Sequence, residues 1–173
     1  MKLRLLIVCT AVLALVVRSA SAQSPSTYST TFSANLDVAY HETGADSHAG
    51  AHFDVAGTLK NDVPVVDIVG EASFNHFSDW TVASVLGGAR VRIPIENERF
   101  LPFAQVLFGL YHCSLCNVND PALQAGGGVD FQLPQLRSFR LRAQADFRHV
   151  FASGGGFDGL RLSGGIVLPL TGQ

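Results

Sequence analysis

The fold of this chain is decided by the stretch FRLRAQADFRH, from Phe139 to His149. Every second residue from Phe139 to Phe147 is apolar, and the residues between them are polar or charged. Side chains alternate between the two faces of a β-strand, so this segment would have one apolar face and one charged face. In a soluble β-sandwich the apolar face packs in the core. In a transmembrane barrel it contacts lipid, and the charged face lines the lumen.

The same alternation recurs along the chain and predicts about eight strands of roughly 9 to 11 residues, the number and length typical of the smallest transmembrane barrels. The strands are expected over Thr31–His41, Ala51–Leu59, Val65–Phe74, Val82–Ile93, Phe100–Tyr111, Leu123–Leu133, Phe139–His149 and Leu160–Leu168. The sequence therefore predicts an all-β fold, a single antiparallel up-and-down transmembrane barrel over residues 31–170. In the fifth strand, which is apolar on both faces apart from Gln105, an inward Gln105 would turn Val106 and Phe108 outward.

The first residues have the pattern of a secretory signal peptide. Lys2 and Arg4 precede an apolar run from Leu5 to Val17, and Ala20-Ser21-Ala22 fits the small-residue cleavage pattern. The run is shorter than the roughly 20 residues that a membrane-spanning helix needs. We expect a signal peptide over 1–22, a flexible arm over 23–30, and an exported mature chain.

Charge and composition exclude some classes of protein. The formal net charge of −2 indicates no binding of nucleic acid. The hydrophobic fraction of 47% is ordinary, which is compatible with a small membrane barrel because such a barrel hides its hydrophobicity in alternation.

The predicted inner faces carry many charges, and arginines outnumber lysines after the first third of the chain. Arginine forms planar, bidentate pairs with carboxylates and suits confined ion-pair networks. We expect a charge network in the lumen, made of Asp67, Glu71, Arg90, Arg92, Asp130, Arg140, Arg142, Asp146, Arg148 and Arg161. A sandwich with an arginine-rich outer face stays open, because neither composition nor period excludes it.

The expected connections differ in length. Those after the second, fourth and sixth strands, around Asn61, Glu96 and Gln135, are compact, and the others are mostly longer. In membrane barrels, short turns face the periplasm and longer loops face outward. Loops are expected over 42–50, 75–80, 112–121 and 152–158, and their modest size argues against a large binding surface.

Several motifs of the second half carry a resemblance to a known family. They are Arg90-Val91-Arg92, Leu101-Pro102-Phe103-Ala104-Gln105, Gly126-Gly127-Gly128-Val129-Asp130, the run from Leu141 to Arg148, and Leu160-Arg161-Leu162-Ser163-Gly164-Gly165. With them, the segment 87–168 resembles the small outer-membrane β-barrels, the eight-stranded type of the outer membrane protein A barrel domain. The resemblance implies the outer membrane as location, its lipid as partner, and insertion by the barrel-assembly machinery. The family often ends in an aromatic residue that this machinery reads, whereas this chain ends Pro169-Leu170-Thr171-Gly172-Gln173.

Two cysteines of the mature chain, Cys113 and Cys116, form a Cys-x-x-Cys pair. In a cytosolic protein this spacing suggests redox or zinc chemistry. An exported protein meets an oxidising compartment, so we expect a local disulfide that closes the loop after the fifth strand. The mature protein would then have no free thiol.

Two further sites were weighed as candidates. His41, His48 and His52, with Asp46 and Asp54 nearby, could bind a metal, but their spacing matches no specific motif. The second candidate is a hydrolase centre made of His149, Ser153 and Glu71. No nucleophile motif surrounds Ser153.

A barrel of this size has an interior that side chains fill. The sequence therefore predicts a structural outer-membrane barrel with a closed, ion-paired lumen and short surface loops, without a cofactor, a metal or catalysis. The alternative is a soluble periplasmic or secreted β-barrel that binds a small apolar ligand. The two hypotheses differ in whether lipid or water contacts the apolar face.

Overall fold

We describe a computed structural model of the chain. It covers residues 28–41, 44–60, 64–76, 81–93, 95, 99–114, 117–133, 139–153 and 155–170. The expected signal peptide, Cys116 and the last three residues lie outside these ranges. No helix in the described ranges is long and apolar enough to cross a membrane.

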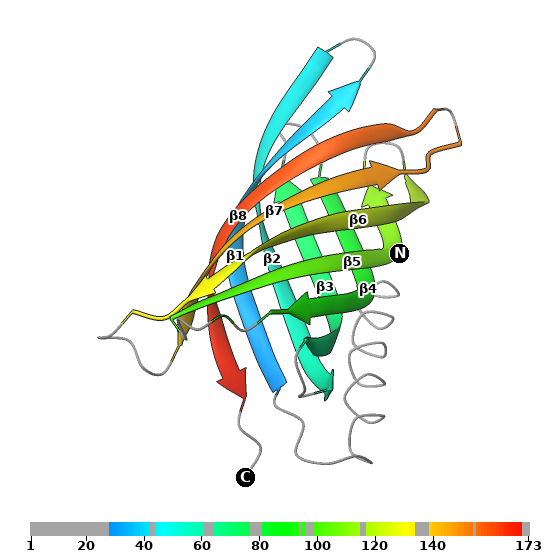
Figure 1. Ribbon diagram of the computed structural model, residues 1–173. Coiled ribbons are helices and arrows are strands. Elements are labelled where there is room, and N and C mark those ends of the chain that lie inside the picture. The colour runs from blue at the N-terminus through cyan, green and yellow to red at the C-terminus, as the bar shows by residue number, and fades with distance from the viewer. Residues whose placement is uncertain are drawn as a thin grey trace.

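Eight antiparallel strands close into one barrel, and each strand pairs with its neighbours in sequence (Figure 1). The first strand, β1, also pairs with the last, β8, which closes the cylinder. The strands are β1 (Tyr28–His41), β2 (Gly44–Lys60), β3 (Val65–His76), β4 (Thr81–Arg92), β5 (Phe100–Cys113), β6 (Val118–Phe131), β7 (Arg140–Val150) and β8 (Phe157–Leu170). The predicted all-β, up-and-down barrel is confirmed.

The alternation of β7 predicts its two faces correctly. Arg142 and Asp146 are 3% and 1% exposed, whereas Phe147 between the polar residues is 50% exposed. The conditional assignment of β5 also holds, because Gln105 is buried and Phe108 is exposed. The charged face of each strand therefore lines the lumen, and the apolar face forms the outer wall.

Several strands are longer than predicted, which corrects the expected loops and the expected arm. The loop expected over 42–50 belongs mostly to β2, and the loop expected over 112–121 is shared between β5 and β6. β8 begins at Phe157, and β1 begins at Tyr28, inside the expected arm of 23–30. The strands continue through polar residues because their backbones stay paired toward the ends of the hairpins. In the hairpin of β1 and β2, for example, Asp37 pairs with His48, and Ala39 pairs with Asp46.

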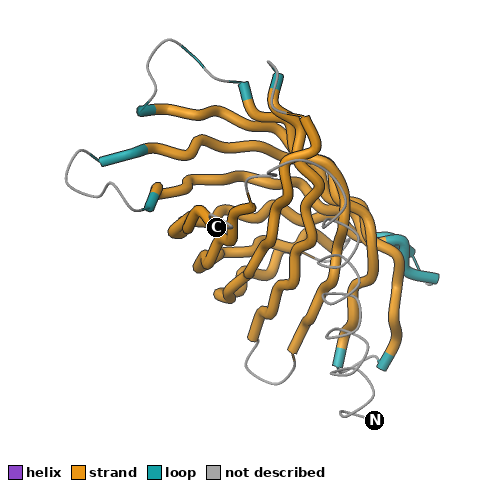
Figure 2. Tube along the Cα trace, turned by 90° about the horizontal axis from the view of Figure 1, so that it is seen from below, coloured by secondary structure: helices purple, strands orange, loops and turns teal. Residues whose placement is uncertain are grey.

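The predicted asymmetry of the connections is wrong. The connections after β2, β4 and β6 span 61–64, 93–99 and 132–139, and the others span 42–43, 77–80, 114–117 and 151–156. The longer strands shorten the second set, because their hairpins stay paired almost to the tip. We call the end with the first set the turn end and the opposite end the loop end. Figure 2, seen from below, shows the strands arranged around the barrel between these ends.

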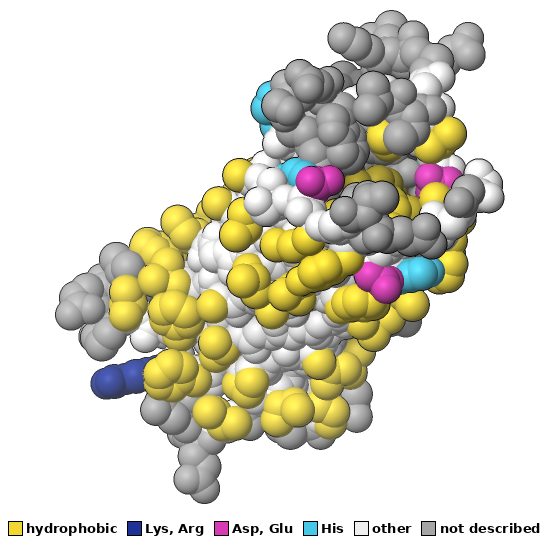
Figure 3. Space-filling model, turned by 90° about the horizontal axis from the view of Figure 1, so that it is seen from above, with side chains coloured by type: hydrophobic (Ala, Val, Ile, Leu, Met, Phe, Trp, Pro, Cys, Tyr) yellow, Lys and Arg dark blue, Asp and Glu magenta, His cyan; other side chains and the backbone are white. Residues whose placement is uncertain are grey.

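The outer wall is apolar and exposed. Large hydrophobic side chains on every strand are more than a third exposed, among them Phe32, Phe74, Val106, Phe108, Phe147 and Leu162. Figure 3 shows hydrophobic side chains spread over the wall, with acidic and histidine side chains toward one end. This distribution is the inverse of a soluble protein, whose large apolar side chains are mostly buried.

Candidate functional site in the lumen

Paired charges fill part of the lumen in a layer that we call the Arg142 layer, made of Asp54, Arg90, Asp130 and Arg142. Arg142 donates to Asp130 over 2.6 Å and 2.8 Å, and to Asp54 over 3.0 Å. Arg90 donates to the same carboxylate of Asp54 over 3.1 Å. The ring of Phe103 lies 4.9 Å from the Arg90 guanidinium carbon and 4.5 Å from that of Arg142. Two arginines and two carboxylates thus neutralise each other around one aromatic ring.

A second layer, the Arg161 layer, is made of Glu71, Asp146, Arg148 and Arg161. Arg161 donates to both oxygens of Glu71 over 2.7 Å and 2.9 Å, and to Asp146 over 2.8 Å. Arg148 lies 3.9 Å from Glu71. All four side chains are buried. The bidentate pairing across strands distant in sequence uses the planar geometry of arginine, which lysine cannot reproduce.

Two glutamines join these charges to each other. Gln105 accepts hydrogen bonds from Arg90 and donates to Asp146 over 3.2 Å, so it links the two layers. Gln124 accepts from Arg148 and donates weakly to Glu71. The sequence pattern gave Gln105 an inward position only as a condition, and the predicted network included neither glutamine. Asp54 was also missed, because it was grouped with the nearby histidines.

The remaining predicted charges lie at the turn end of the lumen. Arg92 donates to Asp67 over 2.7 Å, and Thr58 donates to the same carboxylate over 2.8 Å. Arg140 is half-buried and donates to Gln132 over 3.4 Å. Arg140 therefore belongs to the rim rather than to a buried layer.

Beside the charges, the lumen contains an apolar cluster that the sequence prediction did not include, and its member Leu86 pairs with Glu71. Leu107 is fully buried and packs with Leu86 and Tyr111, and the ring of Phe157 meets that of Tyr111 edge-on at 5.5 Å. The other members are Ala56, Val69, Val82, Cys113, Ala122 and Val150. We call this set the apolar cluster. Leu107 lies two residues after the inward Gln105, so the alternation of a strand also turns Leu107 inward. This signal could have predicted part of the apolar cluster from the sequence.

A small cavity lies beside the apolar cluster. Its lining includes Asp37, Tyr111, Arg148 and Arg161, and its volume is about 30 Å³. A cavity of this size holds about one water molecule. Asp37 accepts a hydrogen bond from Asn75 and thus has a partner in the lumen.

The candidate histidine site holds no metal-binding group. Within the described ranges, no three His, Cys, Asp or Glu side chains lie close enough to bind a metal ion. His48 and His52 point into the lumen, Asp46 is exposed, and Asp54 is occupied by two arginines. The side chain of His41 is outside the described part. These residues of β2 share one face, but they are spread along the strand from the rim at Asp46 to the interior at Asp54.

The candidate hydrolase residues are not brought together. Glu71 faces the lumen, where Arg161 binds it. His149 faces outward and its Nδ1 lies 2.6 Å from Asp158 Oδ1. Because the barrel wall separates Glu71 from His149, these residues do not form the candidate hydrolase centre.

Cys113 is buried at the loop end and belongs to the apolar cluster. Its expected partner, Cys116, lies outside the described residues. The disulfide therefore stays a prediction.

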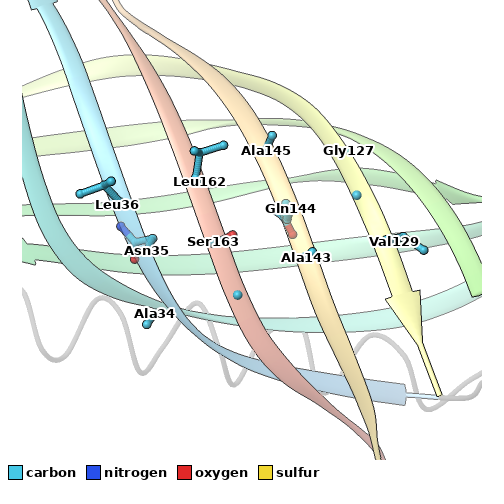
Figure 4. Close-up of a pocket in the computed structure, with 12 residues that line it drawn as sticks. Ala34, Asn35, Leu36, Gly127, Val129, Ala143, Gln144, Ala145, Leu162 and Ser163 are labelled. Atoms are coloured by element: carbon cyan, nitrogen blue, oxygen red, sulfur yellow. The ribbon is translucent and has the colours of Figure 1, made fainter. Parts of the chain in front are cut away.

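The outer wall has a shallow depression of about 660 Å³ across β6, β7, β8 and β1 (Figure 4). Ala34, Gly127, Ala143, Ala145 and Gly164 are among its lining residues. The outer surface is hollowed here because these side chains are short.

Comparisons with known proteins identify the fold. No protein-family model and no curated protein matches the chain. Among solved structures, Neisserial surface protein A matches 82% of this chain and 96% of its own, with a TM-score of 0.65 and 12% identity. Ail, the attachment invasion locus protein of Yersinia pestis, matches 84% of this chain and 100% of its own, with a TM-score of 0.55 and 15% identity. Ail in complex with the heparin analogue sucrose octasulfate matches with a TM-score of 0.53 and 13% identity, over 84% of this chain and 100% of that one.

The chain therefore has the fold of the small eight-stranded outer-membrane β-barrels, as the resemblance of its second half predicted. At these identities the likeness establishes the fold alone. One fold can host many functions, so the function has to be argued from the wall and the lumen.

Proposed function

We propose that this protein is a structural barrel of the outer membrane, with its outer wall in hydrocarbon, a closed lumen, short surface loops and no catalytic activity. The observation that carries the proposal is the exposed apolar wall around the whole cylinder. An apolar surface of this extent on a soluble monomer would drive association, whereas in a bilayer it is the surface that lipid solvates.

The height of the wall supports the membrane location. The outward side chains of β5 from Phe100 to Leu110 are apolar throughout, and the strand advances by ten residues between them. At about 3.3 Å per residue and a tilt of about 40°, this stretch rises about 25 Å, which is the height of the apolar band of membrane barrels. Closure also matters, because an unpaired strand edge in hydrocarbon would leave backbone groups unsatisfied at several kcal/mol each.

The filling of the lumen supports a closed barrel rather than a channel. The Arg142 layer and the Arg161 layer are linked by Gln105, and the apolar cluster fills space beside them. A water-filled pore needs a continuous polar passage, and large side chains occupy that space here. We expect the reconstituted protein to give vesicles no permeability to small sugars, and swelling of such vesicles would contradict the closed lumen.

The alternative, a soluble barrel that binds a small apolar ligand, has less support. Such a binder needs a pocket of several hundred Å³ lined mainly by apolar groups. The cavity of about 30 Å³ in this lumen is lined partly by Asp37, Arg148 and Arg161. The apolar surface of this barrel is on its outside.

Cell fractionation tests the proposal. The mature protein should be recovered with outer membranes, need detergent for extraction, and migrate differently on gels before and after heating. Recovery in the soluble periplasmic fraction without detergent would overturn the proposal. The expected disulfide between Cys113 and Cys116 is tested on the same material, because thiol labelling without prior reduction would contradict it.

A further inference from the structure

Three histidines occupy equivalent places on the outer wall. His76, His112 and His149 lie at or next to the loop ends of β3, β5 and β7. Each follows, two residues later, an apolar side chain of the outer wall, namely Phe74, Leu110 and Phe147, which are 56%, 57% and 50% exposed. We call the three histidines the histidine girdle. They lie at the loop-end margin of the apolar wall, where hydrocarbon would give way to lipid headgroups, and the exposed ring of Phe151 meets that of His149 edge-on at 4.5 Å.

The girdle histidines are oriented in the same way. The Nδ1 atom of His149 lies 2.6 Å from Asp158 Oδ1, and that of His112 lies 2.9 Å from Asn119 Oδ1. Carboxylate and amide oxygens only accept, so Nδ1 donates in both cases. His76 Nδ1 lies 3.5 Å from Thr81 Oγ1 on β4, the other strand of the same hairpin. Nε2 remains, and protonation turns it into a second donor and makes the ring cationic.

No other cation takes this place in the described part of the chain. The described arginines lie in the lumen or near the turn end, and they are Arg90, Arg92, Arg99, Arg140, Arg142, Arg148 and Arg161. The histidines are therefore the groups on the loop-end wall that can become positive. Among the described residues, Asp158 is the one charged side chain that the contacts place against a girdle histidine. It makes the His149 pair negative when the ring is neutral and neutral when the ring is protonated.

We propose that the histidine girdle contacts the phosphate groups of anionic lipids at the outer boundary of the membrane, and that it does so when its rings are protonated. The inference rests on the proposed membrane location. Phosphate oxygens accept hydrogen bonds from cationic donors, and basic side chains are attracted to anionic membrane surfaces. A histidine changes charge between about pH 5 and pH 8, so the contact responds to mild acidification, unlike one made by lysine or arginine.

The test compares unfolding of the full mature chain by urea from two kinds of vesicle, phosphatidylcholine alone and phosphatidylcholine with about a third phosphatidylglycerol, at about pH 8 and about pH 5.5. With the anionic lipid, the wild type should become more stable on acidification, by roughly fivefold in the unfolding equilibrium per girdle histidine, from about 1 kcal/mol per basic side chain near an anionic surface. Combined His76→Gln, His112→Gln and His149→Gln should remove this gain. Combined His76→Lys, His112→Lys and His149→Lys should keep the stabilisation by anionic lipid at both pH values.

The controls separate the outcomes. If acidification stabilised the wild type equally in neutral lipid, or stabilised the glutamine variant equally in anionic lipid, the proposed contact between the histidine girdle and lipid phosphate would be overturned. If inorganic phosphate added to neutral vesicles reproduced the gain, free phosphate rather than a headgroup would be the ligand, and the lipid assignment would fail. Failure of the wild type to insert into neutral vesicles would instead overturn the proposed function.

Discussion

The lumen is filled in two different ways. Four-charge layers around Arg142 and Arg161 are held by hydrogen bonds between strands distant in sequence. Beside them, Leu86, Leu107 and Tyr111 pack together in the apolar cluster. A charged layer depends on every member having its partner, whereas the apolar cluster depends on volume. The two regions should therefore respond differently to substitution.

Arg142→Glu should have the largest effect. It would place a third carboxylate beside Asp54 and Asp130 and leave Arg90 as the remaining cation of the layer. Breaking a buried pair costs about 3–5 kcal/mol, and the added like charge increases this cost. Urea unfolding from vesicles measures the loss.

Arg140→Glu is the matched control, because Arg140 is a half-buried rim residue of the same strand, β7. Its stability should change by less than about 1 kcal/mol. If the two variants had equal stability, position 142 would be solvated and the layer would not exist.

Leu107→Ala should destabilise the apolar cluster by about 2–5 kcal/mol, because it leaves a cavity among buried side chains. Leu110→Ala on the same strand removes the same atoms from the outer wall, where Leu110 is 57% exposed. Lipid can fill the space that Leu110 leaves, so its loss should be clearly smaller. The measurement is again urea unfolding from vesicles, and a larger loss for Leu110→Ala would reverse the assignment of the two faces of β5.

A double-mutant cycle of Glu71→Gln and Arg161→Met tests pairing in the Arg161 layer. Each single change leaves one charge without its bidentate partner. Removing both should therefore cost less than the two single losses added together, by about 1–3 kcal/mol. The same cycle with Val82→Ala, a buried member of the apolar cluster near the start of β4, and Arg161→Met should be close to additive if the regions are independent.

Thr58→Val should have the smallest effect. Thr58 donates a hydrogen bond to Asp67 and accepts one from Arg92, and Arg92 also binds Asp67. Loss of these two hydrogen bonds, with the ion pair kept, costs about 1–2 kcal/mol. A loss as large as that of Arg142→Glu would mean that the turn end of the lumen is held by a tighter network than these contacts describe.

The sequence predicted the charged region far better than the apolar cluster. Arg142 and Asp146 alternate with alanine, so the period of two separates the faces of β7. Leu107 lies in β5, which is apolar on both faces. Apart from Gln105, the alternation of polar and apolar residues therefore does not show which side chains of β5 point inward. The partners of each charge were not predictable either, because Arg161 and Glu71 meet only when the cylinder closes.

The ends of the strands were also missed, for a different reason. Polar residues such as Asp46 and Asn119 suggested loops, but they continue paired strands beyond the apolar wall. The same end of the barrel holds the histidine girdle. Its pattern emerges only when the three hairpins that carry His76, His112 and His149 are aligned by the structure.

The central claim is that hydrocarbon contacts the outer wall and does not reach the lumen. It is tested most directly by quenching of tryptophan fluorescence with lipids that carry bromine on their acyl chains. In a background with Trp80→Phe, which removes the only tryptophan of the chain, Phe108→Trp on the outer wall should be strongly quenched. Phe103→Trp, inside the lumen of the same strand, should be quenched far less. Equal quenching at the two positions, or quenching at neither, would contradict the claim.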